Sequence, residues 1–208
     1  MSLFEIALKG GYLMIVLAIL SILAVAVIIE RIIAIQKSKE LEKNFVDEIT
    51  GYLKKSQIGQ AIKLCDIRID DPIARIFSKG LESIEIGFNE AQQAVEVAAK
   101  MELHKLEKNV AMLSTIAAVA PLVGFMGTVL GMIKVFMKIK ETGGGVDISL
   151  LAGGIWEAMV TTVAGLAIGI ISIIFYNYIV DKIEDIAREL EEKSSDFLID
   201  VRRYYHES

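Results

Sequence analysis

The stretch from Asn109 to Ile133 reads NVAMLSTIAAVAPLVGFMGTVLGMI and carries no charged side chain. Two further uncharged stretches, Gly10–Ile29 and Ala158–Val180, lie before and after it in the chain. Each stretch reaches the roughly 20 residues that a helix needs to cross a bilayer core about 30 Å thick. The sequence therefore predicts an all-α membrane protein with three transmembrane helices.

The composition excludes several other classes of protein. The chain has 208 residues, of which 54% are apolar and 24% charged, and its net charge of −5 argues against binding to nucleic acid. Because Cys65 is the only cysteine, an internal disulfide and a cysteine metal site are excluded, and we expect no metal and no cofactor. His104 and His206 lie outside the uncharged stretches, which leaves no intramembrane base for catalysis, so we do not expect an enzyme and name no catalytic residue.

The distribution of Lys and Arg predicts the orientation. Residues 31–108 hold 13 of the 22 basic side chains, so this segment is expected in the cytoplasm. We expect a short external N-terminal segment (1–10), transmembrane helix 1 (11–30), a cytoplasmic helical domain (31–108), transmembrane helix 2 (109–137), a short periplasmic loop (138–150), transmembrane helix 3 (151–180) and a cytoplasmic C-terminal helix (181–208). A cleaved signal peptide is the alternative for the first stretch, but Glu5 beside Lys9 favours a retained helix.

The second and third transmembrane helices are predicted to extend as long rods into a cytoplasmic helical bundle. No Gly or Pro occurs between Glu90 and Ala120, so one helix is expected to run through this segment. Beyond Asp181, apolar residues from Ile183 to Phe197 repeat on one helical face, which predicts that the third rod packs against the bundle.

Small residues recur at helical spacing in the second and third spans. They are Gly124, Gly127, Gly131, Ala158, Gly165 and Gly169, and they predict close helix packing in lipid. Thr128 and Thr162 lie in the same registers and could either pack or line a pore. Taken alone, packing explains these two threonines better. Pro121 removes one backbone hydrogen bond and is expected to kink the second span.

Glu157 is the unusual residue of the third span, because uncharged sequence follows it as far as Val180. It is either an interfacial carboxylate beside Trp156 or a group in a proton path or paired with a neighbouring subunit, and an ionisable residue in a span is a functional candidate. Glu30 and Arg31, where charge returns after the first span, are expected to anchor that helix at the membrane boundary, as is Trp156.

The spans resemble those of a known family. Leu113–Met132 resembles the second-span signature of the MotA/TolQ/ExbB proton-channel family, and Gly153–Ala167 resembles its third-span signature. Tyr176–Asn177 matches a motif near the inner end of the third span, and Glu30–Arg31 matches the end of the first. Asp71–Ile76 resembles a cytoplasmic segment of the ExbB branch.

The resemblance implies a mechanism that the residues alone do not. It implies a homo-oligomeric ring, a pentamer, of three-span subunits in the bacterial inner membrane, with the N-terminus periplasmic and the C-terminus cytoplasmic. It also implies an ExbD-like single-span partner in the pore, a TonB-like energy-transducing protein and contact with membrane lipids. By motif, Thr128 and Thr162 are expected to line the pore, with Glu157 near its outer part. The family's proline in the third span is absent from Ile168–Ser172, so a straighter helix is expected here.

Two alternatives to an ExbB-like motor subunit stay open. A TolQ-like subunit of the Tol-Pal envelope system has the same three-span layout, and the short N-terminus and the glycine-rich loop at Gly143–Asp147 favour ExbB over it. A membrane scaffold that conducts no ions would need only the small-residue packing faces and neither threonine.

Overall fold

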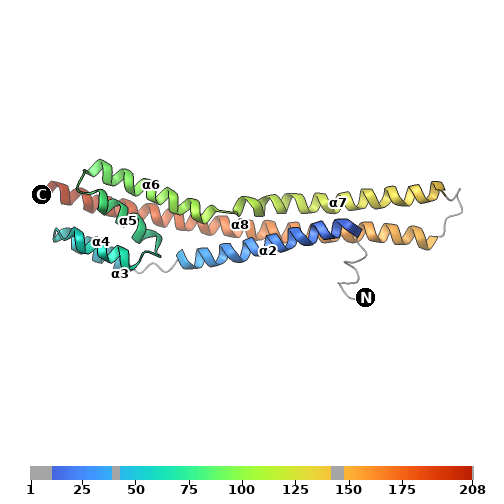
Figure 1. Ribbon diagram of the computed structural model, residues 1–208, viewed down its shortest axis with the longest axis horizontal. Coiled ribbons are helices and arrows are strands. Elements are labelled where there is room, and N and C mark those ends of the chain that lie inside the picture. The colour runs from blue at the N-terminus through green and yellow to red at the C-terminus, as the bar shows by residue number, and fades with distance from the viewer. Residues whose placement is uncertain (1–10, 39–42, 142–147, 208) are drawn as a thin grey trace. The chain divides into compact units, whose positions relative to one another are not determined.

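The computed structural model describes residues 11–38, 43–141 and 148–207, and all regular structure within them is helical (Figure 1). The helices are α2 (Gly11–Ser38), α3 (Lys43–Lys54), α4 (Ile58–Ile67), α5 (Pro72–Ser83), α6 (Phe88–Glu107), α7 (Val110–Glu141) and α8 (Ile148–Glu207). The expected external segment 1–10 lies outside the described residues, as does the part of the expected loop from 142 to 147. The all-α fold is confirmed.

Within the part of the chain that the structure describes, three helical regions are long and apolar enough to cross a membrane, which confirms the predicted number of spans. They are Gly11–Ser38, Phe88–Glu141 and Leu151–Arg203. The chain divides into two compact units, and each is described by itself. The first unit comprises Met1–Glu30 and Asn109–Tyr178, and the second comprises Arg31–Lys108 and Ile179–Ser208.

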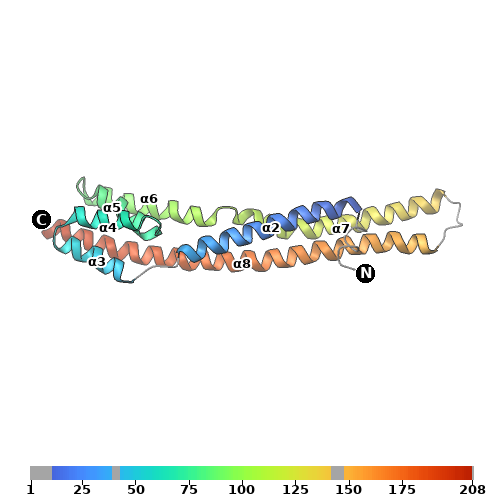
Figure 2. The same cartoon turned by 60° about the horizontal axis from the view of Figure 1, so that its bottom comes forward.

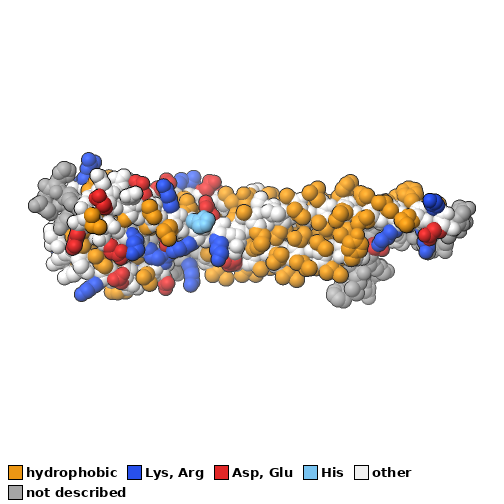
Figure 3. All heavy atoms as spheres, turned by 45° about the horizontal axis from the view of Figure 1, so that its top comes forward, with side chains coloured by type: hydrophobic (Ala, Val, Ile, Leu, Met, Phe, Trp, Pro, Cys, Tyr) orange, Lys and Arg blue, Asp and Glu red, His pale blue; other side chains and the backbone are white. Residues whose placement is uncertain are grey.

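In the first unit, α2, α7 and the first half of α8 run side by side in both views (Figures 1 and 2). Large apolar side chains such as Ile22, Leu122 and Val163 point outward and are exposed, and hydrophobic side chains cover the visible face of these helices (Figure 3). The contacts between the helices are made in part by small residues. An apolar exterior around a small-residue interior is the pattern of helices that pack in lipid.

The second unit is held by an aromatic core. The rings of Phe77 and Phe197 stack with centroids 4.2 Å apart, and Phe45 lies 6.4 Å from Phe77. The repeating face expected on the last part of α8 is buried from Ile183 to Phe197. Charged side chains such as Lys79, Arg188 and Arg203 are exposed on the outside of this unit.

Helix α6 ends at Glu107, and α7 begins at Val110 after a break of two residues. The expected continuous helix is therefore interrupted at Lys108 and Asn109. Asn109 has a φ of 64°, in the left-handed region that asparagine tolerates better than most residues. The absence of Gly and Pro did not reveal this break, because asparagine can also end a helix.

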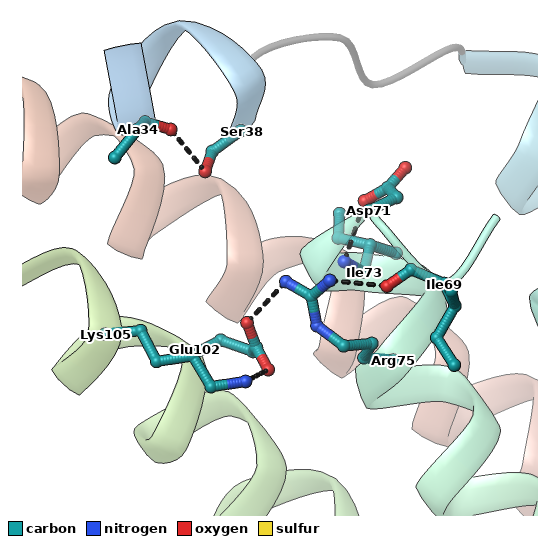
Figure 4. Close-up of polar contacts among 8 residues, drawn as sticks. All are labelled: Ala34, Ser38, Ile69, Asp71, Ile73, Arg75, Glu102 and Lys105. Carbon is teal, nitrogen blue, oxygen red and sulfur yellow. Dashed lines mark hydrogen bonds and ion pairs between the residues drawn. The ribbon is translucent and has the colours of Figure 1, made fainter. Parts of the chain in front are cut away.

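Charged groups join α5 and α6 in the second unit (Figure 4). The guanidinium of Arg75 lies 2.6 Å from the Glu102 carboxylate, which also binds Lys105 Nζ at 2.7 Å. Arg75 further donates to the carbonyl of Ile69. Helix α5 begins at Pro72, where the Asp71 carboxylate caps it by accepting from the Ile73 amide at 2.9 Å.

Candidate functional site

The residues predicted to pack the second and third spans lie where α7 meets α8 in the first unit. A β-carbon on Gly165 would lie 2.5 Å from the Ala120 carbonyl oxygen, and one on Gly124 would lie 2.9 Å from the Thr161 carbonyl oxygen. Both obstacles are backbone atoms, which cannot turn aside. The two helices therefore approach more closely at these glycines than any side chain would allow.

The same contact continues toward both ends of the helices. A β-carbon on Gly131 would lie 2.6 Å from that of Ala158, and one on Gly169 would lie 2.5 Å from the Pro121 ring. The Pro121 ring occupies the space that the missing side chain of Gly169 leaves open across the interface. The predicted small residues thus form one continuous line of contact.

Thr128 lies on α7 and is partly exposed. Its hydroxyl donates to the Phe125 carbonyl of the same helix at 2.6 Å. This local bond leaves the hydroxyl oxygen able to accept a hydrogen bond from outside the helix. Whether Thr128 lines a pore stays a prediction.

Thr162 lies between the helices, where its hydroxyl donates to the Gly124 carbonyl at 2.9 Å. The neighbouring Thr161, which sequence reasoning did not select, is 2% exposed and donates to the Ala158 carbonyl at 2.7 Å. Thr161 also fills the space over Gly127, since a β-carbon there would collide with its side chain. The sequence feature that could have indicated Thr161 is its position four residues before Gly165, which places both residues on the packing face of the helix.

Glu157 forms an ion pair with Lys134, with Oε1 and Nζ 3.5 Å apart. Around this pair, residues of α2, α7 and α8 enclose a small cavity of about 20 Å³, which has room for one water molecule. Its lining includes Tyr12, Gly131 and Thr161. Neither Thr128 nor Thr162 lines this cavity, so the structure does not gather the three predicted pathway residues at one place.

The three predicted boundary residues have different surroundings. Trp156 is exposed on α8. In the first unit, Glu30 accepts a hydrogen bond from the Asn109 side-chain amide at 3.0 Å. In the second unit, Arg31 is 5% exposed, and its guanidinium donates to the carbonyls of Lys105 and Leu106 at 2.9 and 3.2 Å.

These two carbonyls belong to the last turn of α6, where backbone acceptors have no helical partner. Arg31 therefore caps α6, a contact that sequence reasoning missed because it joins distant positions in the chain. Among the described residues, no group of three His, Cys, Asp or Glu side chains lies so that it could hold a metal ion.

Comparison with known proteins gives a family match and similar proteins that carry ExbB and TolQ names. The model of the MotA/TolQ/ExbB proton channel family matches residues 68–192. A Synechocystis protein named ExbB-like 3 is 34% identical over 170 residues, which cover 81% of this chain and 80% of that protein.

Two further relatives extend the comparison. A protein of Methanothermobacter thermautotrophicus named as an ExbB homolog is 27% identical, over 88% of this chain and 64% of its own length. The Tol-Pal system protein TolQ of Haemophilus influenzae is 34% identical over 41% of this chain and 37% of its own length.

Proposed function

Since the chain belongs to the MotA/TolQ/ExbB proton channel family, we propose that it is the ring-forming subunit of a motor driven by the proton-motive force. Five copies, as the resemblance implies, surround an ExbD-like single-span partner in the bacterial inner membrane. Protons pass along that partner, and a TonB-like protein carries the work to receptors in the outer membrane. The chain forms the wall of the channel and catalyses no reaction.

The observation that carries this proposal is that the middle of each predicted span holds no carboxylate that could pass protons across the bilayer. Glu157 lies at the margin of the last stretch, where it is paired with Lys134. A proton path across a bilayer needs groups that bind and release protons, and such groups inside a span are functional as a rule. A partner chain must therefore supply the central proton-carrying group.

The proposed orientation follows from the cytoplasmic placement of residues 31–108, which hold 13 of the 22 basic side chains. The N-terminus is then periplasmic and the C-terminus cytoplasmic. In this orientation, the Lys134–Glu157 pair lies on the periplasmic side, the side from which protons flow inward.

A TolQ-like role in the Tol-Pal system is the second candidate. The similarity to TolQ of Haemophilus influenzae, over 41% of this chain, supports it. The two roles share the ring and the channel and differ in the partner proteins.

The test is co-expression of the chain with single-span, aspartate-bearing partners, one at a time: an ExbD-like protein and the corresponding single-span protein of the Tol-Pal system. Native mass spectrometry of the complex in mild detergent gives the number of copies, and proton flux is then measured in liposomes under an imposed pH gradient. We expect a five-fold ring that takes up the ExbD-type partner and conducts protons only with it.

The outcomes separate the candidates. A ring that takes up only the single-span partner of the Tol-Pal system supports the TolQ-like role. A ring that binds a partner and conducts nothing contradicts the channel and supports a scaffold. A monomer that ignores both partners contradicts every ring-forming role. The control is the same ring with the partner's aspartate replaced by asparagine, which should assemble normally and carry no flux.

A further inference from the structure

Two charged side chains face each other across α7 and α8 at the margin of the uncharged stretches. Lys134 Nζ lies 3.5 Å from Glu157 Oε1, and the side chains are 60% and 35% exposed. An ionisable group at such a depth is costly in lipid unless it reaches water or pairs with an opposite charge. Lys134 and Glu157 are close enough for each charge to lower the cost of the other.

The backbone brings the two residues together. Gly131 lies one helical turn before Lys134, and Ala158 directly follows Glu157. A β-carbon on Gly131 would lie 2.6 Å from that of Ala158, so the helices are in close contact beside the pair. This contact sets the distance between the helices at the level of the pair.

The first turn of α2 completes the arrangement. Gly11, with a φ of +67°, approaches the Glu157 carboxylate so closely that a β-carbon there would lie 2.5 Å from Oε1. The positive end of a helix dipole favours a carboxylate at this position. The Lys134 ammonium lies 6.0 Å from the centre of the Tyr12 ring, within the range of a cation–π contact.

We infer that Lys134 is the positioning residue for Glu157 in the channel: it holds the carboxylate in an ion pair within one subunit, and the first turn of α2 covers that pair. Glu157 is then an anchored charge at the periplasmic side of the pathway, and it does not reach to a neighbouring subunit. This inference rests on the proposed function, because it gives Lys134 a role in ion flux.

The test is a set of charge exchanges in the complex with its partner. We expect Lys134→Met to lower proton flux by about fivefold, the effect of losing a partly exposed ion pair, and Lys134→Arg to keep most of the flux. The single variants Lys134→Glu and Glu157→Lys should be worse than Lys134→Met, because each places like charges together. The double variant Lys134→Glu/Glu157→Lys should regain flux relative to either. Lys140→Met, near the end of the same helix, is the matched control.

Thermal unfolding tests the ion pair between Lys134 and Glu157 independently of proton flux. The midpoints of thermal unfolding are measured for Lys134→Met, Glu157→Gln and the double variant Lys134→Met/Glu157→Gln. If the two residues form an ion pair, the midpoint of this double variant should fall no further than that of one single variant. Wild-type flux from Lys134→Met, or a charge-exchanged double variant no better than the singles, would overturn the positioning role. If the wild-type complex carries no flux, the proposed function fails. If the decreases in unfolding midpoint of the two single variants add up in Lys134→Met/Glu157→Gln, the ion pair itself is contradicted.

Discussion

At the scale of single residues, the two adjacent threonines of α8 have different contacts. Thr161 is buried and bonds within its own helix, whereas Thr162 bonds across to the Gly124 carbonyl. A threonine in a span can thus use its hydroxyl in the helix or between helices, and sequence alone does not distinguish these uses. Thr128 also bonds within its helix, but it is less buried than Thr161.

Thr128 offers a residue-scale test with a close control. Thr115 lies on the same helix, and its hydroxyl likewise donates to a carbonyl of that helix, that of Ala111 at 2.9 Å. If Thr128 lines the pore, Thr128→Val should lower proton flux by about tenfold, since a hydrogen bond to a charged species or its water is worth about 1.4 kcal/mol. Thr115→Val should leave flux unchanged. Equal flux from both variants would remove Thr128 from the pathway.

At the scale of helices, the contact of α7 with α8 depends on where glycine occurs in each. Gly165 and Gly124 meet backbone atoms of the opposite helix, whereas a β-carbon on Gly153 would find no atom within 4 Å. Both kinds of glycine look alike in the sequence. Their roles differ because only some face the neighbouring helix, and the rotation of each helix decides which.

This difference predicts that replacing glycine by alanine has opposite effects on stability at the two kinds of position. Gly165→Ala should lower stability by about 1–3 kcal/mol, because the new methyl group meets the Ala120 carbonyl and forces the helices apart. Gly153→Ala should be neutral or raise stability by up to about 1 kcal/mol, since alanine favours a helix more than glycine does. The midpoint of thermal unfolding in mild detergent, followed by circular dichroism, measures both. A Gly165→Ala protein that melts as high as Gly153→Ala contradicts the close contact.

At the scale of the whole molecule, different forces hold the two units. Close backbone packing joins α7 to α8 in the first unit, whereas the second has a core of stacked phenylalanine rings and a network of charges around Glu102. The Glu102 side chain is 7% exposed. Burial by itself raises the pKa of Glu102, but the hydrogen bonds and charges of Arg75 and Lys105 outweigh it and lower the pKa below its usual 4.5.

The shift of Glu102 predicts how stability depends on pH. Because the carboxyl binds a proton less readily in the folded chain than in the unfolded one, its contribution is fully present above pH 4.5 and is lost as pH falls through the folded pKa. Glu102→Gln should therefore be less stable than the wild type at neutral pH, and the difference should shrink in acid.

The measurement is the midpoint of thermal unfolding between neutral pH and pH 3. The exposed Glu85 lies outside this network, so Glu85→Gln should follow the wild-type curve. A Glu102→Gln protein whose deficit stays constant across the titration would mean that ionisation of this carboxyl contributes nothing to folding.

The sequence by itself determined the all-α fold, the three spans and the family, because charge segregation and the signatures at Leu113–Met132 and Gly153–Ala167 are properties of contiguous residues. It also indicated the small residues that line the α7–α8 contact. Such residues recur at the spacing of a helix face, and that face is set by the periodicity alone.

Only the tertiary structure decided which side chains meet. It paired Glu157 with Lys134, directed Arg31 to the end of α6, and buried Thr161 beside Gly127. It also ended α6 at Glu107 and placed Asn109, in the break before α7, in a conformation that asparagine permits without requiring. These contacts depend on the rotation and separation of helices that are distant in the chain, and no local pattern encodes those two quantities.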